Sequence, residues 1–199
     1  MAASREVIHI HHFFFTKLTL IVNVICASCK RNEQLKVAQA AEIAHMIDIG
    51  DLKTRKGLNQ IGTLQRVGDA CWSSHLRSIS SLMMKFSATC KVLLIIIDEG
   101  NTLSQRAEAN VAYQALTSFE LVFILHLMKE IIEFINSLCK KLQCQSQDIL
   151  NAILFVSSIK EFIQKFRDDG WDDLLTTVKS FCELRSIDIP YMNARYVGR

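Results

Sequence analysis

Residues that interrupt regular structure are scarce in this chain of 199 residues, which contains one proline and seven glycines. All-β folds need turn residues about every 8–12 positions, so this scarcity argues against a sandwich or a barrel. Half of the residues are hydrophobic, which is too many for a disordered chain and enough for a core. We therefore expect an all-α fold, an array of six or seven helices.

The chain also lacks a strong charge imbalance and a long apolar run. Its formal net charge of +3 is too small to indicate a partner by itself. Near the start, Lys17 and Asn23 interrupt the apolar residues, and the uninterrupted part, residues 18–22, is far shorter than the ~18 apolar residues of a membrane span. We interpret this stretch as an amphipathic core helix and expect no membrane partner.

The seven cysteines are odd in number and scattered, which is unlike the paired framework of a small secreted protein. Several lie in apolar runs, as buried thiols in a reducing compartment do. Cys26 and Cys29 have the spacing of a metal or redox pair, but a zinc site needs a second pair of ligands. We interpret them as core cysteines and His9, His11 and His12 as a solvated helix start, so we expect no metal and no cofactor.

Apolar spacing and capping residues predict the helices. The expected spans are residues 7–28, 32–49, 73–98, a stretch that begins at 101–104 and leads into the clear amphipathic pattern up to 142, then 146–170 and 171–185. Asn32 and Ser146 are the expected N-caps of two of them, and Gly50, Gly100 and Gly170 are the expected stops.

Four carboxylates gather within six residues, at Asp168, Asp169, Asp172 and Asp173. Such a cluster can bind magnesium or calcium. Gly170 between the two pairs instead favours a helix break, with Asp168 or Asp169 as the next N-cap and the later pair in its first turn. Trp171 would then anchor the corner by packing.

We find no convincing nucleophile system in the sequence. Cys71 and His75 lie one helical turn apart, but apart from Asp69 no acid is near to orient the histidine. We therefore expect no enzymatic activity and no small-molecule substrate.

A basic connection without sustained periodicity runs through residues 51–72. Connections of this length tend to be functional or disordered. It is either a surface loop anchored by Trp72, or a nucleic-acid contact in which Trp72 stacks on an unpaired base. In the second interpretation the phosphates would be bound by Lys53, Arg55, Lys56 and Arg66.

The same region carries a family resemblance. Gly57-Leu58-Asn59-Gln60 and then residues 64–75, LQRVGDACWSSH, resemble the GLNQ…LxRxGDTRWSSH segment of hAT-superfamily transposase-like proteins. The nearest in appearance are plant proteins labelled zinc finger MYM-type or general transcription factor 2-related zinc finger. Residues 24–31 (VICASCKR), 166–172 (FRDDGWD) and 193–196 (NARY) are similar to the same group, so the resemblance covers most of the chain.

The resemblance implies a helical region inserted into an RNase H-like transposase core. It assigns residues 1–50 to the part that follows the second catalytic Asp, 51–72 to the basic loop with the Trp motif, 73–188 to the helical insertion domain and 189–199 to a tail. Trp72 matches the tryptophan that helps active members handle the transposon end. Cys71 and Ala70 stand where the family has arginine and threonine, and the lost arginine is a donor suited to phosphate.

The family's catalytic Asp and Glu positions and its zinc finger have no counterpart in this chain. We therefore expect a truncated, catalytically inactive transposase-derived protein in the nucleus, with at most weak non-specific binding to DNA. A related full-length transposase-like protein is a further expected partner. The alternatives are an α-helical protein-interaction module and a gene fragment without a selected role.

Overall fold

In the computed structural model, the described residues are 2–48, 61–66, 72–142 and 149–191. Within these ranges the chain forms eight α-helices and no strand. They are α1 (Ala2–Cys26), α2 (Cys29–Asp48), α3 (Trp72–Met84), α4 (Phe86–Glu99), α5 (Leu103–Leu116), α6 (Phe119–Leu142), α7 (Ile149–Asp169) and α8 (Trp171–Leu184). The all-α prediction is confirmed, and the expected number of helices was too low.

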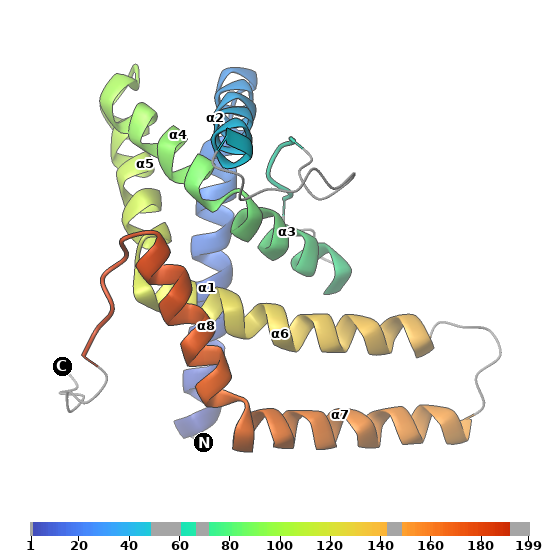
Figure 1. Ribbon diagram of the computed structural model, residues 1–199. Helices are drawn as coiled ribbons and strands as arrows, with labels where there is room; N and C mark the ends of the chain where they lie inside the picture. The colour runs from blue at the N-terminus through green and yellow to red at the C-terminus, as the bar shows by residue number, and fades with distance from the viewer. Residues whose placement is uncertain (1, 49–60, 67–71, 143–148, 192–199) are drawn as a thin grey trace.

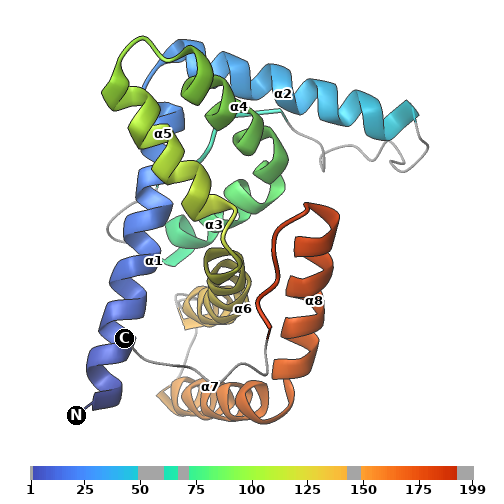
Figure 2. The same ribbon diagram turned by 90° about the vertical axis from the view of Figure 1, so that its left-hand side faces the viewer.

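The helices surround a core to which most of them contribute. α1 runs along one side of the molecule, from the level of α7 to the corner where α2 begins (Figures 1 and 2). α4 and α5 lie side by side, and α3 packs on α6 (Figure 1). α7 forms the lower edge in both views, with α6 above it and α8 joined to one end.

The core begins with one stripe of α1, in which Phe14, Leu18, Ile21 and Ile25 recur at helical spacing and are fully buried. α5 packs on α1, and its own buried side chains include the small Ala109 and Ala112. Small side chains allow two helix backbones to approach closely. Each large apolar side chain buried in this way contributes roughly 1.5–3 kcal/mol.

The corner between α1 and α2 turns the chain by 97°. Ser28 Oγ accepts a hydrogen bond from the backbone N–H of Arg31 at 3.2 Å, so Ser28 caps α2. The prediction of Asn32 as the cap was wrong, because Asn32 lies inside the helix and its N–H donates to Ser28 O. The expected cap Ser146 and the expected stop Gly50 lie outside the described residues.

The turn from α4 to α5 follows the local sequence signals. Gly100 ends α4, and a Cβ at this position would lie 2.5 Å from the carbonyl oxygen of Ile96. Thr102 caps α5 by accepting from the N–H of Gln105 at 3.2 Å. The predicted stop at Gly100 is confirmed, and the observed cap Thr102 lies within the start predicted at residues 101–104, since capping chemistry is local.

A second corner divides the helix expected over residues 73–98, so that prediction was wrong. α3 ends at Met84, Lys85 forms the turn, and α4 leaves at 75° to α3. No glycine or proline marks the break. The bend lets α3 pack on α6 while α4 packs on α2 and α5, which a straight helix cannot do.

The aspartate-rich corner joins α7 to α8 through Gly170. A Cβ on Gly170 would lie 2.7 Å from the carbonyl oxygen of Phe166, so the close approach requires glycine. Asp172 and Asp173 occupy the first turn of α8 as predicted, where negative charge interacts favourably with the helix dipole. The N-cap position belongs to Gly170, so Asp168 or Asp169 as the cap was wrong; the Asp168 carboxylate accepts from Gln164 instead.

Trp171 packs across this corner while remaining half exposed. Its ring meets that of Phe123 in α6 edge to face, with centroids 5.3 Å apart. This contact agrees with the anchoring role expected for Trp171.

Among the described residues, no single helix combines the length and apolar content needed to cross a bilayer. Two bent pairs meet those criteria when taken together, His12–Cys26 with Cys29–Asp48 and Ser73–Met84 with Phe86–Glu99. Their bends are the two corners at Ser28 and Lys85.

Candidate functional site

The residues expected to contact DNA are only partly within the described structure. Lys53, Arg55 and Lys56 lie outside it. Trp72 is the first residue of α3, and its side chain lies outside the description as well. Arg66 is described and exposed, and it is the last residue of a short segment that two helices contact.

Residues 61–66, which we call the clamped segment, are held between α2 and α3. The side chain of Gln39 donates to Gly62 O at 2.7 Å and accepts from Gly62 N–H at 3.0 Å. Ser78 Oγ donates to Gln65 O at 2.7 Å, and Leu64 is buried. Two helices thus provide partners for three backbone groups of a non-helical segment, which the sequence pattern alone did not indicate.

Two arginines donate hydrogen bonds to carbonyl groups at the carboxyl end of α1. Arg31 Nη1 donates to Val24 O at 2.7 Å, and Arg66 Nη2 donates to Cys26 O at 3.4 Å. Cations are favourable where the last carbonyls of a helix lack intrahelical partners. Arg66 therefore supports the fold and still presents part of its guanidinium group at the surface.

Cys26 and Cys29, which have the spacing of a metal or redox pair, differ in their exposure. Cys29 is exposed, so its assignment to the core was wrong, whereas Cys26 is half-buried and its thiol lies 3.8 Å from Leu64 O. Burial raises the pKa of the Cys26 thiol, and nearby Arg66 opposes that change. Within the described ranges, no three His, Cys, Asp or Glu side chains are placed to bind one metal ion.

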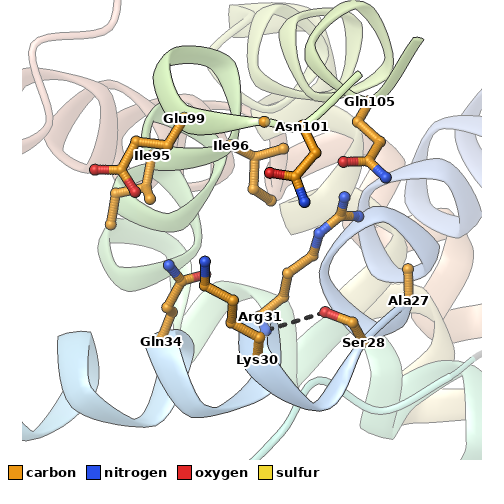
Figure 3. Close-up of a pocket in the computed structure, with 11 residues that line it drawn as sticks. Ala27, Ser28, Lys30, Arg31, Gln34, Ile95, Ile96, Glu99, Asn101 and Gln105 are labelled. Carbon is orange, nitrogen blue, oxygen red and sulfur yellow. Dashed lines mark hydrogen bonds between the residues drawn. The ribbon is translucent and has the colours of Figure 1, made fainter. Parts of the chain in front are cut away.

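A first cavity, of about 360 Å³, lies between the start of α2 and the α4–α5 turn (Figure 3). Lys30 and Arg31 line it on one side and Glu99 on the other, so its charges are mixed. Figure 3 shows the Arg31 side chain extending toward Asn101 and Gln105. Glu99 offsets one of the two cations, and Arg31 already donates to Val24 O, so this cavity has a smaller excess of positive charge than the second one described below.

A second cavity, of about 850 Å³ and open to solvent on one side, is lined by α2, the clamped segment, α3 with the turn that follows it, and the residue that follows α8. Three cationic side chains line it, those of Arg77, Lys85 and Arg185, against one carboxylate, Glu42. Hydroxyl groups contribute as well, from Thr63, Ser80 and Ser81. We call this space the cationic cavity.

The end of α8 determines where Arg185 lies. Ile187 N–H donates to Cys182 O at 2.9 Å and Ser186 N–H to Glu183 O at 3.2 Å, which is the bonding pattern of a Schellman motif. Ser186 takes the left-handed conformation of that motif, with φ of 54°. Arg185 is therefore the C-cap of α8, held by a defined backbone turn.

The Arg185 guanidinium lies against two aromatic rings. It is 3.7 Å from the centre of the Phe181 ring and 5.6 Å from that of Phe86. Burial lowers its pKa from the ordinary value, although Glu42 acts in the opposite direction. Its Nε is buried without a hydrogen-bond partner among the described residues. Cation–π contact thus holds a partly dehydrated charge at the wall of the cavity.

The cationic cavity was not predicted from the sequence. Arg77 and Lys85 lie close together in the chain, in α3 and in the turn that follows it, whereas Arg185 follows the distant helix α8. No spacing rule links Arg185 to the other two cations, because only the packing of the helices brings it to the same space.

Comparison of this chain with protein-family models, with curated proteins and with solved structures finds no match. The resemblance to hAT-superfamily proteins therefore rests on the residues quoted above. Its functional implications stay predictions.

Proposed function

We propose that this chain is a catalytically inactive, hAT transposase-derived helical protein that binds the nucleic-acid backbone weakly and without sequence preference in the nucleus. The observation that best supports this proposal is that the clamped segment holds Arg66 at the surface, next to the basic connection. The same connection carries Lys53, Arg55 and Lys56 in the sequence. Together these residues supply charge that suits several phosphates along a strand.

We expect weak binding to DNA because few cationic side chains take part, and one of them also bonds to the protein itself. Arg66 already donates to Cys26 O, and the family's arginine before the tryptophan is Cys71 here. About four phosphate contacts give a salt slope of roughly −3 in a plot of log affinity against log salt concentration. Affinity should therefore fall steeply between low and physiological salt.

The test is fluorescence anisotropy of labelled single-stranded and duplex DNA over a series of salt concentrations. The triple variant K53Q/R55Q/K56Q should weaken binding and flatten the salt slope by about two units or more. The matched control is K160Q/K165Q/R167Q, which removes the same charge from exposed positions of α7. Equal losses in the two triple variants would mean that only net charge matters and would contradict the proposed interface.

A nicking assay with magnesium tests the inactive assignment. We expect no cleavage of generic or transposon-end DNA by the purified chain. Robust cleavage that disappears when an acidic residue of this chain is changed would refute the proposal.

A helical interaction module is the second candidate function, and the surface of α7 favours it. Four apolar side chains there, Ile153, Leu154, Val156 and Ile163, are between 49% and 64% exposed. Exposed apolar side chains grouped on one element are typical of surfaces that bind other proteins. Binding to a related transposase-like chain that survives high salt, is lost in I153K/V156K, and occurs without DNA retention at low salt would favour this function over the first.

A further inference from the structure

The cationic cavity contains positive charge that its own residues do not neutralise. The ion pairs formed by the described residues join Lys36 to Glu33 and Lys129 to Glu133. None of them involves the cations of the cavity. Glu42 lines the same space as a single carboxylate against three cations, which leaves an excess of two positive charges.

Two of these cations are also partly removed from water. Burial lowers the pKa of Lys85 as it does that of Arg185. The Lys85 ammonium donates to Ser81 Oγ at 3.2 Å, which leaves further N–H donors on that group. Desolvated cations attract an anion more strongly than hydrated ones, because the surrounding dielectric constant is lower.

The hydrogen-bonding groups of the cavity match a phosphate. An arginine presents a planar fork that suits two oxygens of one phosphate, and a lysine adds a compact point charge. Ser80, Ser81 and Thr63 add hydroxyl donors at the walls. A terminal phosphate carries about −1.5 to −2 charges near pH 7, close to the excess of the cavity.

We propose that the cationic cavity binds a phosphomonoester through the positive charges of Arg185, Lys85 and Arg77. The volume of about 850 Å³ exceeds the needs of one phosphate and accommodates an attached organic group. This chemistry occurs in a free nucleoside monophosphate and in the terminal phosphate of a nucleic-acid strand. The inference does not depend on the proposed function, because the cationic residues of the two sites do not overlap.

Isothermal titration calorimetry at low salt tests the site with adenosine 5′-monophosphate, inorganic phosphate and adenosine as probes. We expect both phosphates to bind in the millimolar range or tighter and adenosine not to bind. R185M should weaken phosphate binding about ten-fold or more, and E42Q should tighten it about three-fold, because a repelling carboxylate is lost. The matched control R167M changes an exposed arginine of α7 and should leave binding unchanged.

K85M provides a second test if R185M lowers the yield of folded protein, since Lys85 lies at a corner and not against the aromatic rings. It should weaken phosphate binding in protein whose circular dichroism is unchanged. Failure of both phosphates to bind the folded wild-type chain would overturn the inference. Binding that neither K85M nor R185M weakens would overturn it too.

Two oligonucleotides, one with a 5′-phosphate and one with a 5′-hydroxyl, distinguish the possible sources of the ligand. A preference for the phosphorylated strand that R185M removes would assign the site to strand ends. Equal binding of the two strands, with nucleotide binding still dependent on Arg185, would assign it to free phosphomonoesters. K53Q/R55Q/K56Q should leave nucleotide binding unchanged, so failure of the proposed DNA interface and failure of this site give different results.

Discussion

α4 and α7 are both apolar helices with polar positions between the apolar ones, yet they occupy different environments. α4 buries six side chains between α2, α3 and α5. In α7 no described side chain is fully buried, and its contacts with α6 include the stacking of Phe162 on Phe134, with ring centroids 3.8 Å apart. Helical periodicity therefore indicates which face of a helix is apolar but not whether that face is covered.

The same substitution in the two helices should give the largest contrast. Leu93 of α4 is fully buried, so Leu93→Ala removes packed apolar atoms and leaves a cavity, at a cost of about 2–5 kcal/mol. Leu154 of α7 is 64% exposed, so Leu154→Ala should change the free energy of unfolding by less than about 0.5 kcal/mol. Urea unfolding followed by circular dichroism measures both, and similar losses would mean that α7 is packed as tightly as α4.

Gly170, at the corner between α7 and α8, should be the next most sensitive position to substitution. In Gly170→Ala the new methyl would meet Phe166 O at 2.7 Å, so the α7–α8 corner must shift, at a cost of about 1–3 kcal/mol. Gly62→Ala is the matched control, because nothing lies within 4 Å of a Cβ there. Hydrogen exchange should become faster in α7 and α8 of Gly170→Ala. Unchanged exchange in these helices would contradict tight packing at the corner.

A smaller loss of stability should appear as the pH falls, and a buried histidine of the core should cause it. His126 of α6 is buried, its Nδ1 lies 2.8 Å from Val122 O, and burial lowers its pKa. The unfolded chain then binds the proton more readily, so stability falls as the pH drops below about 6.5 and is unaffected by this group above that value. Thermal unfolding from pH 7.5 to 5 checks the slope, which should be shallower in His126→Gln. An equal slope in both proteins would assign the acid sensitivity to other groups.

Local chemistry explains which parts of the fold were predictable. Gly100 and Thr102 mark a helix end and start because a close backbone approach and a side-chain cap act within a few residues. The corner at Lys85 was missed because it arises from the directions of α6, α2 and α5 and has no breaker residue. Likewise Asn32 and Ser28 are both acceptable caps by type, and only the observed bond selects Ser28.

The candidate site was less predictable than the fold. Arg66 was identified from charge, but its bond to Cys26 O depends on the clamped segment passing the end of α1. Gln39 and Ser78 hold that segment from two helices, and neither belongs to a recognisable motif. Arg185 was not identified, since its role depends on Phe86 and Phe181 meeting around it.

Residue order alone was sufficient for the all-α class, for most helix boundaries and for the apolar stripe of α6, because these follow from interactions between near neighbours. Packing in three dimensions was needed for the bend at Lys85, the exposure of α7 and the grouping of three cations around one cavity. Those features depend on contacts between residues that are distant in the chain, and no periodicity or spacing encodes such contacts.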